Sequence, residues 1–231
     1  MAGIHLAAII ILSYLAGSFP TSILVGKIFF HKDIRQFGSG NAGGTNTVRV
    51  FGWPAGIAVI LVDIAKGAVP VLLIARLPLL GSAEAALLPP DVTALCAGAA
   101  AVIGHIWTVF AGFRGGKGVA TAAGMIVALY PLGFVLTLVV FVLAIVLTGI
   151  VSAGSLAAAV AFPAVLFILN GTGATAISAP LLWFSLPIAA LILFSHRANI
   201  GRFIRGEEKP MFGKKKREKD SPESDSDKSG Y

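Results

Sequence analysis

The feature that most constrains this fold is a long stretch without charge, because residues 118–196 contain no Asp, Glu, Lys or Arg. A soluble domain needs charged side chains over its surface, so a stretch of this length indicates a protein embedded in a lipid bilayer. The rest of the chain agrees, since 56% of its 231 residues are hydrophobic and only 13% are charged. We therefore predict an all-α fold, a polytopic transmembrane helical bundle.

Apolar segments long enough to cross a bilayer recur along the chain. A break in the longest run is expected at Pro131, because proline removes a hydrogen-bond donor; a re-entrant segment before it is the alternative to a full crossing. Connections 31–52 and 112–118 carry excess Lys and Arg, whereas 78–91 carries only acidic charge. The positive-inside rule then gives about seven spans, with the N-terminus outside and the C-terminus cytoplasmic. The expected spans are 4–29, 53–76, 92–111, 119–131, 132–150, 154–170 and 178–195.

The two ends of the chain differ in character. The first basic residue, Lys27, follows the first apolar segment, which predicts a retained helix instead of a cleaved signal peptide. Residues 1–206 are expected to form the membrane domain. Residues 207–231 are polar, rich in Ser and mixed in charge, which predicts a disordered cytoplasmic tail. Its basic run at 214–217 either contacts anionic lipid headgroups or is simply solvated.

The sequence "FGSGNAGGTNTVRVFG", at 37–52, is the first candidate site. Its glycines allow the backbone to turn so that N–H groups converge on an anion, and an arginine adds a fork suited to phosphate oxygens. The alternative is a flexible turn between helices, which the close spacing of hydroxyl, amide and guanidinium groups disfavours. The candidate phosphate-binding residues are Ser39, Gly40, Asn41, Thr45, Asn46 and Arg49.

The sequence "GGKG", at 115–118, is the second candidate. A nucleotide-binding P-loop is excluded in detail, because that pattern requires Gly at 111 and Ser or Thr at 118, where this chain has Ala111 and Gly118. The physics of anion binding still applies, since a lysine precedes a helix N-terminus. We therefore expect Gly115, Gly116, Lys117 and Gly118 to bind a phosphate without a nucleotide.

The sequence "HRANIGR", at 196–202, is the third candidate, and it follows the last apolar segment. An arginine-rich helix end usually only anchors a span, but that reading does not explain His196 and Asn199. These two residues lie three apart and share a face if the helix continues. They are the candidate residues of this segment, followed by Arg202.

Several polar residues in apolar segments have structural and functional interpretations. Asp63 and Lys66 lie three apart, which predicts a mutual ion pair. Ser152 and Ser155 either assist helix packing or contact a ligand. His105 is either an interfacial histidine with its hydrogen bonds satisfied or a functional group. The single cysteine predicts no disulfide, and the scattered histidines suggest no metal site.

These segments together resemble the acyl-phosphate-dependent glycerol-3-phosphate acyltransferases of bacterial membranes. The resemblance is carried, in order, by "LAGSFPTSILVGK", "GSGNAGGTNTVR", "DIAKG", "GH", "FRGGKGVAT", "VSAGS" and "HRANIGR". It implies a multi-pass enzyme of the bacterial plasma (inner) membrane, with its active site on the cytoplasmic side and no cofactor. The implied substrates are acyl phosphate and glycerol 3-phosphate, among membrane lipids.

The resemblance also implies roles for the candidate residues. Ser39, Thr45, Asn46 and Arg49 would surround the phosphate of the donor. Gly116, Lys117 and Gly118 would hold the phosphate of the acceptor. His196 and Asn199 would orient the acceptor or the transferring group, helped by Ser152 or Ser155. A transporter or channel for phosphate esters is the competing class, because basic glycine-rich loops also form anion pathways; a purely structural scaffold would leave the clustered donors unexplained.

Overall fold

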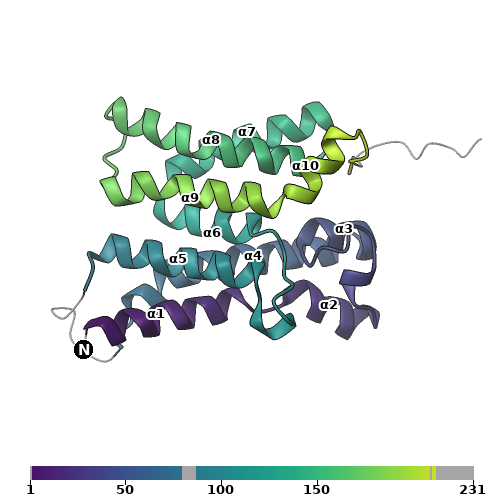
Figure 1. Cartoon of the computed structure of the whole chain (residues 1–231), viewed down its shortest axis with the longest axis horizontal. Coiled ribbons are helices and arrows are strands. Elements are labelled where there is room, and N and C mark those ends of the chain that lie inside the picture. The colour runs from purple at the N-terminus through teal and green to yellow at the C-terminus, as the bar shows by residue number, and fades with distance from the viewer. Residues whose placement is uncertain (1, 80–86, 209, 212–231) are drawn as a thin grey trace, which may run out of the picture.

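The computed structural model describes residues 2–79, 87–208 and 210–211, and all regular structure in these ranges is helical. Long helices run side by side between two ends of the molecule (Figure 1). The α-helices are α1 (Ala2–Gly17), α2 (Thr21–Phe30), α3 (Gly44–Phe51), α4 (Trp53–Leu72), α5 (Pro90–Ile106), α6 (Val119–Leu129), α7 (Pro131–Thr148), α8 (Val151–Gly171), α9 (Ala179–Ser195) and α10 (Arg197–Ile204).

The predicted break at Pro131 is confirmed, since α6 ends at Leu129 and α7 begins at Pro131. Among the described residues, five helical segments are long and apolar enough to cross a membrane, or six if α9 and α10 count as one bent span. Helix α6 has 11 residues and is about 16 Å long, well short of the roughly 30 Å of a bilayer core. Helix length alone therefore gives fewer than seven full crossings, and the count of seven stays a prediction.

The first apolar segment, expected as one span over 4–29, is one candidate span in the structure, Ala2–Phe30, but its helix is interrupted. Helix α1 ends at Gly17 and α2 begins at Thr21, because Pro20 has no N–H to continue the helical ladder. The break exposes carbonyl oxygens that need partners in an apolar setting. Lys66 Nζ donates to Phe19 O at 2.7 Å, and Thr108 Oγ1 donates to Ser18 O.

Small residues let the helices of this bundle pack closely. A Cβ added at Gly67 would lie 1.9 Å from Thr121 O, and one at Gly124 would lie 1.8 Å from Ile64 O, so α4 and α6 touch backbone to backbone. Gly104 makes the same kind of contact between α5 and α1, where a Cβ would lie 2.2 Å from Tyr14 O. Such contacts are typical of helices packed within a membrane.

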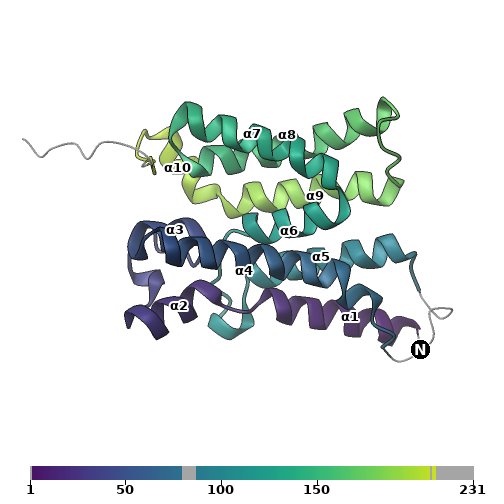
Figure 2. The same cartoon turned by 180° about the vertical axis from the view of Figure 1, so that it is seen from behind.

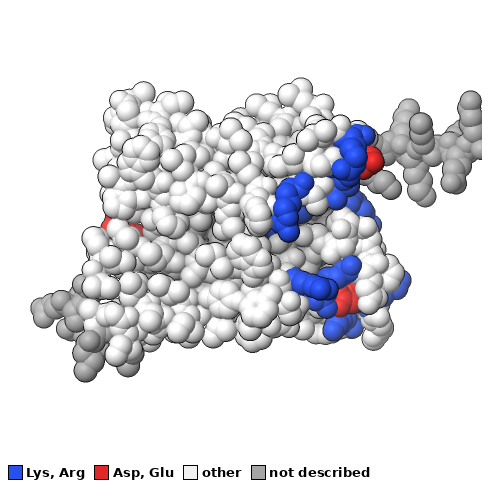
Figure 3. Space-filling view, viewed as in Figure 1, with Lys and Arg blue, Asp and Glu red and all other residues white. Residues whose placement is uncertain are grey.

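Exposed charge lies toward the ends of the molecule, whereas Asp63 and Lys66 are buried within it. The N-terminus lies at one end, whereas α3 and α10 lie at the other, in both views (Figures 1 and 2). The space-filling view shows Lys and Arg gathered at the α3 and α10 end and an uncharged surface between the two ends (Figure 3). This distribution suits an apolar belt in lipid with one strongly basic aqueous face.

Candidate active site

The first candidate segment, expected as a loop, contains a short helix. Thr45, Asn46 and Arg49 lie on α3, which begins at Gly44 after the turns at Gly38 and Gly40, both in the left-handed region. Asn46 is buried and its amide is fully engaged: Oδ1 accepts from Ser39 N at 2.8 Å, and Nδ2 donates to the carbonyl oxygens of residues 34, 37 and 41. Asn46 therefore holds the turn in shape, while Arg49 is exposed at the basic end.

The second candidate segment folds back against the end of α5. Gly115 N donates to Ile106 O and Gly116 N donates to His105 O, each at 3.1 Å, at the last turn of α5. A Cβ at Gly116 would lie 2.1 Å from His105 Nε2, so only glycine fits there. Gly118 has φ +82 and caps the start of α6. The two glycine N–H groups are thus committed to α5, and the Lys117 side chain is left as the charged donor of this segment.

The third candidate segment bends where the last long helix ends. Helices α9 and α10 meet at an angle of 59° around His196, which is buried. His196 Nδ1 lies 2.8 Å from Ile192 O, so Nδ1 carries the proton and donates, and the neutral ring has its lone pair on Nε2. Asn199, one turn into the bend, accepts from Lys117 Nζ through Oδ1 at 2.5 Å. Ser195 Oγ also donates to Lys117 O at 2.9 Å.

A carboxylate that sequence reasoning did not select completes this cluster. Glu208 Oε1 accepts from Ser152 Oγ and from Asn199 Nδ2, both at 2.6 Å, and Oε2 accepts from Arg202 Nε at 2.6 Å. Burial alone would raise the pKa of Glu208, but these hydrogen bonds and the charge of Arg202 hold it below its usual value. Glu208 is therefore ionised at neutral pH and joins α8, α10 and the Lys117 loop.

Lys117 is the cation at the centre of the cluster. Burial lowers the pKa of Lys117 to about 8, and the positive charges of Arg202 and Arg49 act in the same direction, whereas the Glu208 carboxylate opposes them. Helix α3, which carries Arg49, lies at the same end of the molecule as α10 (Figure 1). All three candidate segments thus converge at the basic end.

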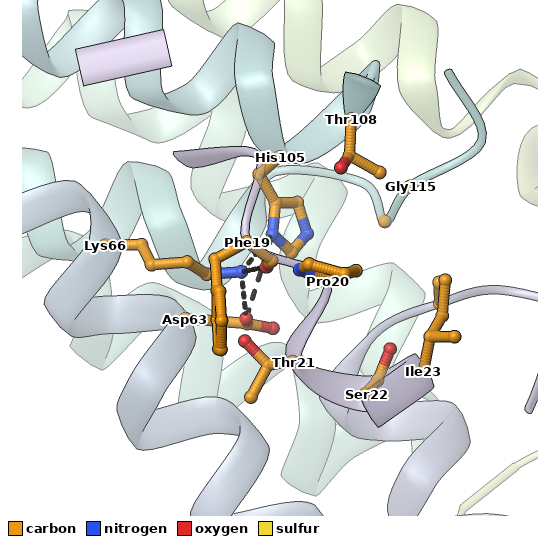
Figure 4. A pocket seen from close by; sticks show the side chains of 12 residues that line it. Phe19, Pro20, Thr21, Ser22, Ile23, Asp63, Lys66, His105, Thr108 and Gly115 are labelled. Carbon is orange, nitrogen blue, oxygen red and sulfur yellow. Dashed lines mark hydrogen bonds and ion pairs between the residues drawn. The ribbon is translucent and has the colours of Figure 1, made fainter. Parts of the chain in front are cut away.

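A second polar cluster lies deeper, between α4, α5 and the α1–α2 break (Figure 4). Lys66 Nζ is 2.7 Å from Asp63 Oδ1, which confirms the predicted ion pair. His105 Nδ1 lies 3.5 Å from Lys66 Nζ and 3.8 Å from Asp63 Oδ1. All three side chains are buried, and the cavity they line has a volume of only about 10 Å³, so their chief contacts are with one another and with Phe19 O.

An open cavity of about 390 Å³ lies where the first two segments meet. It is lined by the predicted Gly40 and Gly115 and by Arg35 and Arg114, which were not predicted as site residues. The Arg35 guanidinium is held by two hydrogen bonds: Nη2 donates to Asp33 Oδ2 at 2.7 Å, and Nη1 donates to Ala111 O at 3.0 Å. The hydrogen bond from Arg35 lowers the pKa of Asp33, so this pair stays charged.

Comparison with known proteins decides the family. Residues 7–206 match the family described as glycerol-3-phosphate acyltransferase. This chain belongs to that family. It is 47% identical over 232 residues to a glycerol-3-phosphate acyltransferase of Chlorobaculum parvum, covering 90% of this chain and 97% of the relative, and 45% identical to the one of Chlorobaculum tepidum, with the same coverage. The resemblance drawn from the sequence motifs is therefore confirmed.

Two solved structures of similar fold support the assignment to this family. The glycerol 3-phosphate form of PlsY (YgiH), an integral membrane glycerol 3-phosphate acyltransferase, matches this acyltransferase with a TM-score of 0.74 and 30% identity, covering 90% of this chain and 96% of that one. The lysophosphatidic acid form of PlsY matches with a TM-score of 0.72 and 30% identity, covering 90% and 95%. An all-helical, multi-pass membrane fold is thus shared.

The structure brings some predicted residues of this acyltransferase together and leaves others apart. Lys117, Asn199 and Ser152 lie in one hydrogen-bonded cluster, with His196 beside it. Ser155 donates instead to Val151 O within its own helix, at 3.1 Å. Glu208 follows Gly206, whose positive φ turns the chain back toward α8. The sequence did not predict this turn, because acidic residues after an arginine-rich helix are typical of a solvated tail.

Proposed function

We propose that this acyltransferase moves an acyl chain from acyl phosphate to the sn-1 hydroxyl of glycerol 3-phosphate, as the first step of phospholipid synthesis. The products are 1-acylglycerol 3-phosphate (lysophosphatidic acid) and inorganic phosphate. The observation that carries the proposal is the hydrogen-bonded cluster of Lys117, Asn199 and Arg202, joined through Glu208, at the basic end of a member of this family. Arg49, on α3, lies at the same end. The forms in which PlsY was solved, with glycerol 3-phosphate and with lysophosphatidic acid, support the same substrate and product.

The proposed reaction is a direct transfer. The sn-1 oxygen attacks the carbonyl carbon of the acyl phosphate, an ester bond forms, and the bond from that carbon to the phosphate oxygen breaks. The phosphate leaves with the electron pair and takes the hydroxyl proton on one of its own oxygens. An acyl phosphate is already activated, so positioning and charge neutralisation supply most of the catalysis.

The residues divide into two groups in this proposal. Lys117 and Asn199 hold the phosphate of glycerol 3-phosphate, and His196 accepts a hydrogen bond from the acceptor through Nε2. Ser39, on the turn that Asn46 fixes, and Arg49, on α3, bind the donor phosphate from the other side. The acyl chain extends from this basic end into lipid, and we place this end on the cytoplasmic face of a bacterial plasma membrane.

A transfer assay tests the proposal. The purified protein in detergent is given palmitoyl phosphate and radiolabelled glycerol 3-phosphate, with palmitoyl-CoA or an acyl carrier protein thioester as alternative donors. We expect lysophosphatidic acid and an equal amount of inorganic phosphate from acyl phosphate alone. Product from a thioester alone would refute the donor assignment, and an acyl-enzyme trapped on Ser39 would refute direct attack. Uptake of glycerol 3-phosphate into proteoliposomes without any product would favour a transporter.

A further inference from the structure

Glu208 holds an unusual place in the cluster around Lys117. Its side chain is only 10% exposed, and three different side chains donate to it at 2.6 Å. The segment that carries it is fixed on both sides, because Glu207 N donates to Arg202 O and Met211 N donates to Gly149 O, each at 2.8 Å. Its neighbour Glu207 is different: its side chain is exposed and, in the part of the chain that the structure describes, pairs with the exposed Arg205.

The hydrogen bonds that link Glu208, Asn199 and Lys117 allow one orientation of the Asn199 side-chain amide. An ionised carboxylate only accepts hydrogen bonds, and a lysine ammonium only donates them. Asn199 lies between the two, so its NH₂ group must face Glu208 and its oxygen must face Lys117, as the structure shows. Without the carboxylate, the amide loses the acceptor that holds its NH₂ end, and with it the position from which its oxygen meets Lys117.

We propose that Glu208 is a positioning residue of the transfer site: it orients Asn199 so that Asn199 holds the Lys117 ammonium in place for a substrate phosphate. This inference rests on the proposed function. Glu208 itself touches no reacting atom, since its two oxygens are engaged by Ser152, Asn199 and Arg202.

The same carboxylate keeps Lys117 charged. The charged and titratable groups around Lys117 are Glu208 on the segment after α10, Arg202 on α10, Arg49 on α3 and His196 at the α9–α10 bend. Burial and the two arginines lower the pKa of Lys117, and Glu208 is the group that raises it. Loss of the carboxylate therefore moves the deprotonation of Lys117 to lower pH.

Binding of radiolabelled glycerol 3-phosphate to the purified full chain, measured from about pH 7 to about pH 10, tests this role. The ligand phosphate is already a dianion above about pH 7, so alkaline loss of binding reports the protein. For Glu208→Gln we expect weaker binding at neutral pH. We also expect the midpoint of the alkaline loss to fall by about half a pH unit or more, which is about a threefold additional loss of affinity above that midpoint. Glu207→Gln, the matched control, is expected to match wild type in both respects.

The outcomes separate positioning from a purely structural effect. Weaker binding with an unchanged midpoint would mean that Glu208 only supports the fold, and an unchanged affinity and midpoint would exclude any role; either overturns the proposal. If Glu208→Gln does not fold, Glu208→Asp replaces it: the shorter carboxylate is expected to weaken binding with a smaller shift, and wild-type values would overturn the proposal. Binding without acyl transfer in wild type would refute the proposed function, while the pH dependence would still decide the role of Glu208.

Discussion

Replacing Lys66 with methionine is expected to destabilise the fold by about 3–5 kcal/mol, the usual cost of leaving one member of a buried ion pair uncompensated. The structure shows that this ion pair is short and almost completely buried. Lys66 Nζ lies 2.7 Å from Asp63 Oδ1, and the two side chains are 8% and 2% exposed (Figure 4). Lys66→Met would leave the Asp63 charge in an apolar interior and would also remove a donor from Phe19 O.

The double variant Asp63→Leu/Lys66→Met is expected to be more stable than Lys66→Met alone. It removes both charges, and its main remaining cost is the hydrogen bond that Phe19 O loses, about 1–3 kcal/mol. Reversible unfolding in mixed detergent micelles, followed by tryptophan fluorescence, compares both variants with wild type. Arg205→Met is the control, because its pair with Glu207 is more than half exposed and is worth at most about 1 kcal/mol. A double variant less stable than Lys66→Met would refute the argument.

Three further predictions concern the site. Lys117→Ala and Arg49→Ala are each expected to lower the transfer rate at least about tenfold while leaving the unfolding midpoint near that of wild type; a near-normal rate in either would contradict the assignment. Because the pKa of Lys117 is lowered to about 8, its charge is present below that pH and lost above it, so kcat/KM for glycerol 3-phosphate should fall about tenfold per pH unit above about pH 8. This fall should be absent in Lys117→Arg, and its persistence there would assign it to another group. Gly116→Ala should impair transfer strongly, because the new Cβ would lie 2.1 Å from His105 Nε2, whereas Gly171→Ala, which meets nothing within 4 Å, should not; equal effects in a rate assay would rule out steric exclusion.

Local signals in the sequence predicted much of the fold. Hydropathy and the proline at 131 predicted helices and the α6–α7 break, and the spacing of Asp63 and Lys66 predicted their ion pair. These features depend on residues near one another in the chain. The break at Pro20 was missed, because its exposed carbonyls are satisfied by Lys66 and Thr108, which lie far away in the sequence.

The candidate site was predicted in its components but not in its connections. Three segments were selected by residue type, yet the Asn46 amide is not an open donor, since it is hydrogen-bonded to the backbone of residues 34, 37, 39 and 41 and holds the turn in shape. Glu208 was assigned to a tail because its segment is polar. Its contacts with α8 and α10 depend on a turn at Gly206, which no local pattern encodes. The rest of that tail, residue 209 and residues 212–231 with the basic run at 214–217, lies outside the described residues, as does Glu84 of the 78–91 connection.

The central claim is that segments at one end of the molecule form a binding site for a phosphate headgroup around Lys117. Equilibrium binding of radiolabelled glycerol 3-phosphate, in the absence of any acyl donor, tests it most directly. We expect saturable binding that excess inorganic phosphate displaces. This binding should be weakened at least about tenfold in Lys117→Met and unchanged in Arg205→Met, which removes an exposed charge from the same face. Equal binding by wild type and Lys117→Met, or equal weakening in both variants, would show that the ligand responds only to general surface charge and would contradict the account.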